Sequence, residues 1–142
     1  YIHILENWGM YSTQMNIFFE KYDLYLTPTT ASVAPKNGEV AIPSWQKPIL
    51  KGLLKVGKAH YLAQGKLVEK MVQENLSWVP FTQLANVTGL PAMSVPLYWN
   101  KNGLPLGSQF IAPFGREDRL LQLAAQLEQA QPWMPQYKNI QL

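Results

Sequence analysis

Residues 81–96 read FTQLANVTGLPAMSVP, and this stretch predicts a short helix that leads directly into a strand. Gly89 follows the helical pattern of residues 81–87, and glycine suits the left-handed position that ends many helices. Pro91 then fixes the backbone where an extended run begins, Ala92 to Trp99. Because a helix, a glycine cap and a strand follow one another so closely, this part of the chain is expected to mix helix and sheet.

A second strand is expected to return beside the first one. Asn100-Lys101-Asn102-Gly103 separates the run 92–99 from another extended run, Leu106 to Ala112. An Asn-Gly pair accepts the positive backbone angles of a tight hairpin at little cost. Both runs carry apolar residues on their two faces, so we expect the pair of strands to be buried on both sides.

The beginning of the chain predicts a helix followed by a third strand. Residues 4–22 carry apolar side chains at steps of three and four, which is the spacing of one helix face. A short strand is expected over residues 23–27, and Pro28 should end it because proline cannot donate to a ladder. The predicted core-facing stripe of the helix consists of Ile4, Trp8, Tyr11, Met15, Phe18, Phe19 and Tyr22.

The last predicted helix begins at Arg116 and is closed by Pro132. Glu117 and Asp118 lie in its first turn, where acidic side chains interact favourably with the helix dipole. Its apolar face is formed by Leu120, Leu121, Leu123, Ala124 and Leu127. The predicted fold class is therefore α/β, with a sheet of at least three strands and flanking helices, in an order that the sequence does not fix.

Residues 45–76 show two further helical patterns and most of the basic residues. Lysines at helical spacing usually form a solvated helix face, and this interpretation is favoured over binding to nucleic acid or an anionic membrane surface. The net charge of the whole chain is only +3, so the electrostatic field that would attract an anionic partner is weak. The lysines of this region are Lys36, Lys47, Lys51, Lys55, Lys58, Lys66 and Lys70.

The composition of the 142-residue chain excludes several classes of protein. Charged residues make up 15%, which is low for a soluble domain and indicates that much of the surface is meant to be covered. The absence of cysteine excludes disulfides and thiolate metal sites, and fits a cytoplasmic protein. With only His3 and His60, a multi-histidine metal centre is not expected. No run is long and apolar enough for a membrane helix, and no signal peptide is recognisable.

The residues show no self-contained catalytic site. No Gly-x-Ser-x-Gly elbow, Ser-x-x-Lys motif or phosphate-binding loop is present. Ser94 is interpreted as a strand residue, since no activating base accompanies any serine in the sequence. We therefore predict no catalytic residue, metal or cofactor in this chain.

Four blocks of the sequence, taken together and in this order, resemble the C-terminal part of amidase signature hydrolases. Each block is weak alone, but their order makes the resemblance specific. The blocks are Tyr22 to Thr29, Phe81 to Pro96, Gly103 to Ala112 and the helix from Glu117 to Pro132-Trp133. The resemblance implies an α/β fold with a large mixed sheet, and the hydrolysis of amide bonds.

The resemblance also implies what this chain lacks. Family members use a serine nucleophile, a bridging serine and a lysine, with a Gly-Gly-Ser-Ser stretch that is not found here. Residues 1–142 are thus expected to form one C-terminal segment of an amidase domain, inactive alone, whose partner is the N-terminal catalytic portion of the same enzyme. Residues 31–76 match least well and are expected to be a variable helical insertion.

A substrate class follows from one position of the family pattern. Members that handle glutamine carry an acid just ahead of the Phe-Thr pair, whereas Ser77 to Phe81 contains none. A buried ammonium without a carboxylate would be costly, so we expect a small neutral amide substrate, as for 6-aminohexanoate cyclic dimer hydrolases. Trp78, Phe81 and Thr82 are the expected substrate-binding residues. The alternative is a non-catalytic module that self-associates, for example as a homodimer.

Overall fold

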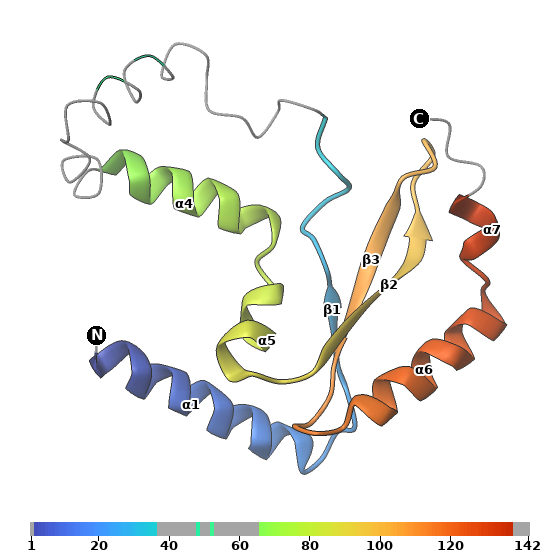
Figure 1. Cartoon of the computed structure of the whole chain (residues 1–142), viewed down its shortest axis with the longest axis horizontal. Helices are drawn as coiled ribbons and strands as arrows, with labels where there is room; N and C mark the ends of the chain where they lie inside the picture. Colours follow the sequence, from blue (N-terminus) through green and yellow to red (C-terminus); the bar gives the residue numbers. More distant parts are fainter. Residues whose placement is uncertain (1, 37–47, 49–51, 53–65, 138–142) are drawn as a thin grey trace. The chain divides into compact units, whose positions relative to one another are not determined.

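The computed structural model describes residues 2–36, 48, 52 and 66–137 (Figure 1). The chain divides into two compact units, one made of residues 1–34 and 79–142 and the other of residues 35–78. The second unit contains α4 (Lys66–Trp78). The elements of the first unit are α1 (Ile2–Phe19), β1 (Tyr25–Pro28), α5 (Thr82–Thr88), β2 (Ala92–Trp99), β3 (Pro105–Ile111), α6 (Glu117–Ala130) and α7 (Met134–Tyr137).

The first unit is built on a three-stranded sheet in the order β1-β3-β2. Both pairings of the central strand β3 are antiparallel. The two sequence-adjacent strands β2 and β3 form the expected hairpin, in which the Asn100 side chain accepts hydrogen bonds from the backbone N–H groups of Asn102 and Leu104 at 2.9 and 2.8 Å. The three predicted strands and the α/β fold class are thus confirmed.

The connection from α5 to β2 follows the prediction from the sequence. Gly89 ends α5 with φ of 67°, a left-handed conformation that costs other residues free energy. The carbonyl of Pro91 accepts a hydrogen bond from the Ala112 N–H at 3.0 Å, which fixes the start of β2 against the end of β3.

β2 contains an irregularity beside its proline. The register with β3 shifts between Val95 and Tyr98, where three steps along β2 match two steps along β3. Such a bulge leaves one residue of the strand outside the hydrogen-bond ladder. Pro96, which has no N–H group to donate, lies within the bulge. Pro28, expected to end β1, instead occupies its last paired position opposite Ser108. A proline is tolerated there because β1 is an edge of the described sheet.

Each face of the sheet carries its own apolar cluster, as the mixed apolar pattern predicted. The first face, here called the α5 face, packs on α1 and α5 through Ile111, which is fully buried. The opposite face, here called the α6 face, packs on α6. The buried members of the two clusters are Met15, Ala85, Leu90 and Ile111 on the α5 face, and Val95, Phe110, Ala112 and Leu120 on the α6 face.

The predicted stripe of α1 is confirmed only near the end of the helix. Met15 is buried, and Phe18 and Phe19 pack partly against the cluster of the α5 face. Trp8, Tyr11 and Tyr22 remain exposed, and Tyr22 lies beyond the end of α1, so the prediction of one continuous core-facing stripe is wrong for them. Among the described helices, α1 packs chiefly on α5. A helix of seven residues is too short to cover two more turns of α1.

The region 31–76 is described only in part. The second predicted helical pattern corresponds to α4. The first pattern, which begins at Trp45, lies largely outside the described residues, as do the side chains of most of the lysine run. The division at residues 35 and 78 lies close to the expected limits of the insertion, whose family-variable character stays a prediction.

Candidate functional site

Polar side chains form one row across the sheet on the α5 face. Gln109 of β3 pairs with Thr27 of β1 on one side and with Ser94 of β2 on the other. In the preceding row, Tyr25 and Ile111 belong to the part of this face that packs on α1 and α5, whereas Ala92 beside them is exposed. Since alternate residues of a strand share a face, the α5 face changes from apolar to polar within two residues. Thr27, Gln109 and Ser94 are called the polar row below.

Gln109 connects the polar row to the start of α5. Its side chain is only 5% exposed, and a buried amide needs hydrogen-bond partners. The Nε2 group donates, at 3.5 Å each, to the Thr27 hydroxyl and to the backbone carbonyl of Phe81. Both bonds are long, and together they tie the residue before α5 to the centre of the sheet.

Of the three expected substrate-binding residues, Phe81 and Thr82 are consecutive residues at the start of α5. Phe81 is the N-cap residue of α5, and its side chain is 39% exposed. Thr82 begins α5, and its hydroxyl donates to the carbonyl of Val79 at 3.1 Å. Trp78 ends α4 and is partly buried there, in the other unit. A substrate contact by any of the three stays a prediction.

Two hydroxyl groups meet one step further along the sheet. The Thr29 Oγ1 and Ser94 Oγ atoms lie 2.5 Å apart and share a hydrogen bond. They meet above Gly107, whose carbonyl accepts a hydrogen bond from the Thr29 N–H at 2.8 Å. A Cβ atom on Gly107 would lie 2.5 Å from the Ser94 hydroxyl oxygen and 2.6 Å from that of Thr29. The meeting of the two hydroxyls therefore requires glycine at this position.

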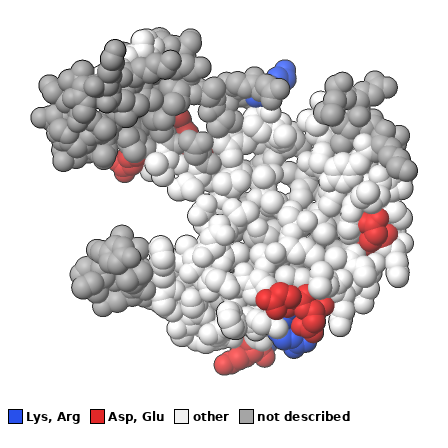
Figure 2. Space-filling view, viewed as in Figure 1, with Lys and Arg blue, Asp and Glu red and all other residues white. Residues whose placement is uncertain are grey.

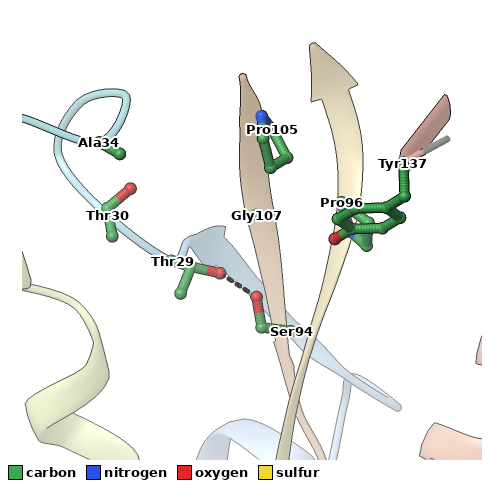
Figure 3. Close-up of a pocket in the computed structure, with 8 residues that line it drawn as sticks. All are labelled: Thr29, Thr30, Ala34, Ser94, Pro96, Pro105, Gly107 and Tyr137. Atoms are coloured by element: carbon green, nitrogen blue, oxygen red, sulfur yellow. Dashed lines mark hydrogen bonds between the residues drawn. The ribbon is translucent and has the colours of Figure 1, made fainter. Parts of the chain in front are cut away.

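The hydroxyl pair lies in a pocket of about 270 Å³, here called the hydroxyl pocket (Figure 3). In Figure 3 the side chains of Thr29, which directly follows β1, and Ser94 of β2 point toward one another. No lining side chain is charged. The lining residues are Thr29, Thr30, Ala34, Ser94, Pro96, Pro105, Gly107 and Tyr137.

Charged side chains gather elsewhere in this unit. On the face seen in Figure 2 most of them lie near the beginning of α6 and the turn after α1, and a further acidic patch lies over the later part of α6. Arg119 donates to the Asp23 carboxylate at 2.6 Å, and Arg116 makes two 2.8 Å bonds to Asp118. The hydrogen bonds from Arg116 lower the pKa of Asp118 from 3.8 to about 2. The Arg119–Asp23 pair connects α6 to the segment before β1, whereas the Arg116–Asp118 pair lies within the beginning of α6.

Features of a metal site or a membrane span are absent from the part of the chain that the structure describes. There, no three histidine, cysteine or acidic side chains converge as metal ligands would. No helix among the described residues has both the length and the apolar character needed to cross a bilayer. Ser94, the serine in the pocket, has the Thr29 hydroxyl as its partner, and a neutral hydroxyl is not a general base.

The arrangement is suited to hold a neutral group by hydrogen bonds and apolar contact. The sequence interpretation placed Ser94 correctly in a strand but did not identify Thr29, Gly107 or Gln109 as site residues. Thr27 and Thr29 share a face by the two-residue alternation of a strand, which was a signal available in the sequence. The meeting of Thr29 with Ser94, 65 residues apart in the chain, requires the strand order and so could not be read from spacing.

Known proteins resemble this chain over most of its length. The family model described as Amidase matches residues 2–121. Lipoamidase of Enterococcus faecalis is 38% identical over 80% of this chain and 15% of its own length. The 6-aminohexanoate-cyclic-dimer hydrolase of Pseudomonas sp. (strain NK87) is 37% identical over 83% of this chain and 21% of its own length.

A solved structure supports the same relationship. The structure of 6-aminohexanoate cyclic dimer hydrolase superimposes with a TM-score of 0.63 at 30% identity, covering 90% of this chain and 23% of that protein. The chain spans about a fifth of the length of the curated relatives it matches. With a family model matching residues 2–121, the chain belongs to the amidase family, of which it represents a C-terminal part.

Proposed function

We propose that this chain is the C-terminal part of an enzyme that hydrolyses carbon–nitrogen amide bonds in small neutral substrates. The observation that carries the proposal is the family match over residues 2–121. Because the chain spans about a fifth of its relatives, the serine, bridging serine and lysine expected of the family would come from an N-terminal portion of the same enzyme. The isolated chain is then inactive, since a serine without a base is a weak nucleophile.

The preference for a neutral substrate is supported by the absence of charge at two places. Ser77 to Phe81 holds no carboxylate to pair with a substrate ammonium. The hydroxyl pocket likewise has no charged lining residue. An ionic group taken out of water without a counter-charge loses its hydration with no compensation. Apolar, linear or cyclic amides, such as 6-aminohexanoate oligomers, are therefore favoured over glutamine.

Phe81 and Thr82 are proposed to contact the substrate, together with Trp78. Two observations support Phe81. Gln109 donates a hydrogen bond to the backbone carbonyl of Phe81, and Phe81 itself is partly exposed and so accessible to a ligand. Residues 31–76 are proposed to be a variable helical insertion of the family, with a solvated lysine face.

The experiment is to express the complete reading frame that encodes this chain and to measure hydrolysis of a substrate panel. The panel contains 6-aminohexanoate cyclic dimer, a linear aliphatic amide and glutamine. We expect hydrolysis of the neutral amides and little hydrolysis of glutamine. An enzyme that hydrolyses glutamine and ignores both neutral amides would contradict the substrate class, and one that hydrolyses none would contradict the function.

A second candidate function is self-association without catalysis. The observation in its favour is the number of large apolar side chains that stay exposed, including Trp8, Leu26 and Tyr98. Large exposed apolar surface and edge strands both promote association. Light scattering of the purified chain over a range of concentrations tests this candidate, and a constant monomer mass would exclude it.

A further inference from the structure

We propose that the hydroxyl pocket binds the carboxamide group of a small neutral amide through the hydroxyls of Thr29 and Ser94. The inference rests on the proposed function only for the choice of an amide as the natural ligand. The argument for binding comes from hydrogen-bond capacity, charge and size.

The hydroxyl pair matches an amide in hydrogen-bond capacity. Two hydroxyls bring two O–H donors and four acceptor positions, and the bond between Thr29 and Ser94 uses one donor and one acceptor. One O–H group therefore remains to donate, and lone pairs remain to accept. An amide offers a carbonyl that accepts and an N–H that donates, so it can engage both functions at once.

The charge of the pocket selects against ionic ligands of the same shape. A carboxylate could accept from the remaining O–H, but it would find no cation among the lining residues to pair with. An ammonium would meet no anion there. A ketone keeps the carbonyl but lacks the N–H group, so it loses the second bond.

The size of the pocket fits a short aliphatic amide. A volume of about 270 Å³ lies just below the usual range of small-molecule sites, roughly 300–1,000 Å³. Ala34, Pro96, Pro105 and the ring of Tyr137 provide apolar wall for an alkyl group. Gly107 adds no side chain between the two hydroxyls, and any Cβ there would collide with both.

The first experiment titrates the chain with three ligands of the same shape while backbone amide resonances are followed by NMR. The probes are isobutyramide, isobutyrate and 3-methyl-2-butanone. We expect isobutyramide to shift the resonances of Thr29, Thr30, Ser94 and Gly107, with a dissociation constant about tenfold lower than that of the ketone. Isobutyrate is expected to cause no saturable shift.

A variant pair connects the binding to the two hydroxyls. The double variant Thr29→Val, Ser94→Ala removes both, and its dissociation constant for isobutyramide is expected to rise about tenfold or more. Ser108→Ala is the matched control, because Ser108 lies on β3 next to Gly107 but on the opposite face. The control should bind isobutyramide as the unaltered chain does.

Three results would overturn the inference. These are equal binding of isobutyrate and isobutyramide, shifts centred away from the pocket, and unchanged affinity in a folded double variant. If the double variant does not fold, the comparison of the three ligands on the unaltered chain still decides. Since no hydrolysis is measured, failure here is separate from failure of the proposed function.

Discussion

The two faces of the sheet differ in how completely this chain covers them. On the α6 face, α6 contributes Leu120 to a cluster that also buries Val95, Phe110 and Ala112. On the α5 face, apolar packing by α1 and α5 stops after the row that contains Ile111, and the polar row follows. The α6 face is therefore apolar where α6 packs on it, whereas the α5 face changes from an apolar core to the polar row and the hydroxyl pocket.

The largest loss of stability is expected from truncating a buried apolar side chain in the core cluster of either face. Ile111→Ala removes a fully buried side chain from the α5 face and should lower the free energy of unfolding by about 2–5 kcal/mol. Leu120→Ala on the α6 face should cost a similar amount, since Leu120 is 4% exposed. Urea unfolding measures both. A cost below 1 kcal/mol for one variant alone would show that its cluster is not a core.

The next largest effect is expected at Gly107, where the pocket meets the sheet. Gly107→Ala places a methyl group 2.5 Å from the Ser94 hydroxyl oxygen, so the strands or the side chains must shift. Overpacking of this kind should cost about 1–3 kcal/mol of unfolding free energy. Gly9→Ala in α1 is the control, because no atom lies within 4 Å of its added Cβ. That control should be stabilised by up to about 1 kcal/mol, as alanine favours helices.

A smaller and more local effect is expected at Gln109. Gln109→Leu removes the donor that serves the Thr27 hydroxyl and the Phe81 carbonyl, and should cost about 1–2 kcal/mol. Amide hydrogen exchange should accelerate at the start of α5 more than in α6. Gln122→Leu, on the exposed surface of α6, is the matched control and should leave exchange in α5 unchanged. Equal acceleration throughout the unit would mean that Gln109 does not hold this segment specifically.

The smallest effect concerns the charged end of α6. The folded-state pKa of Asp118 is lowered to about 2 from 3.8, so its stabilisation is complete above pH 4 and is lost as the pH falls toward 2. Because the pair is exposed to solvent, the change in stability will be slight. A carboxyl-carbon NMR titration measures this pKa directly. In the variant Arg116→Gln the pKa should return toward 3.8, and a titration unaffected by that change would exclude Arg116 as the cause.

The sequence predicted the elements better than the site because the two depend on different information. The hairpin at Asn100, the cap at Gly89 and the apolar run of β2 are local patterns, and all are observed. The polar row depends on β1 pairing with β3, between residues more than 80 positions apart. Trp8 and Tyr11 were misassigned to the core because periodicity identifies an apolar face without showing how far its partner extends.

The central claim is that this chain supplies one part of an amidase and not a complete active site. The most direct measurement compares hydrolysis of one neutral amide, such as 6-aminohexanoate cyclic dimer, by the isolated chain and by the polypeptide from the complete reading frame. We expect no activity above buffer for the isolated chain and measurable turnover for the complete polypeptide. Turnover by the isolated chain that persists through repeated purification would contradict it.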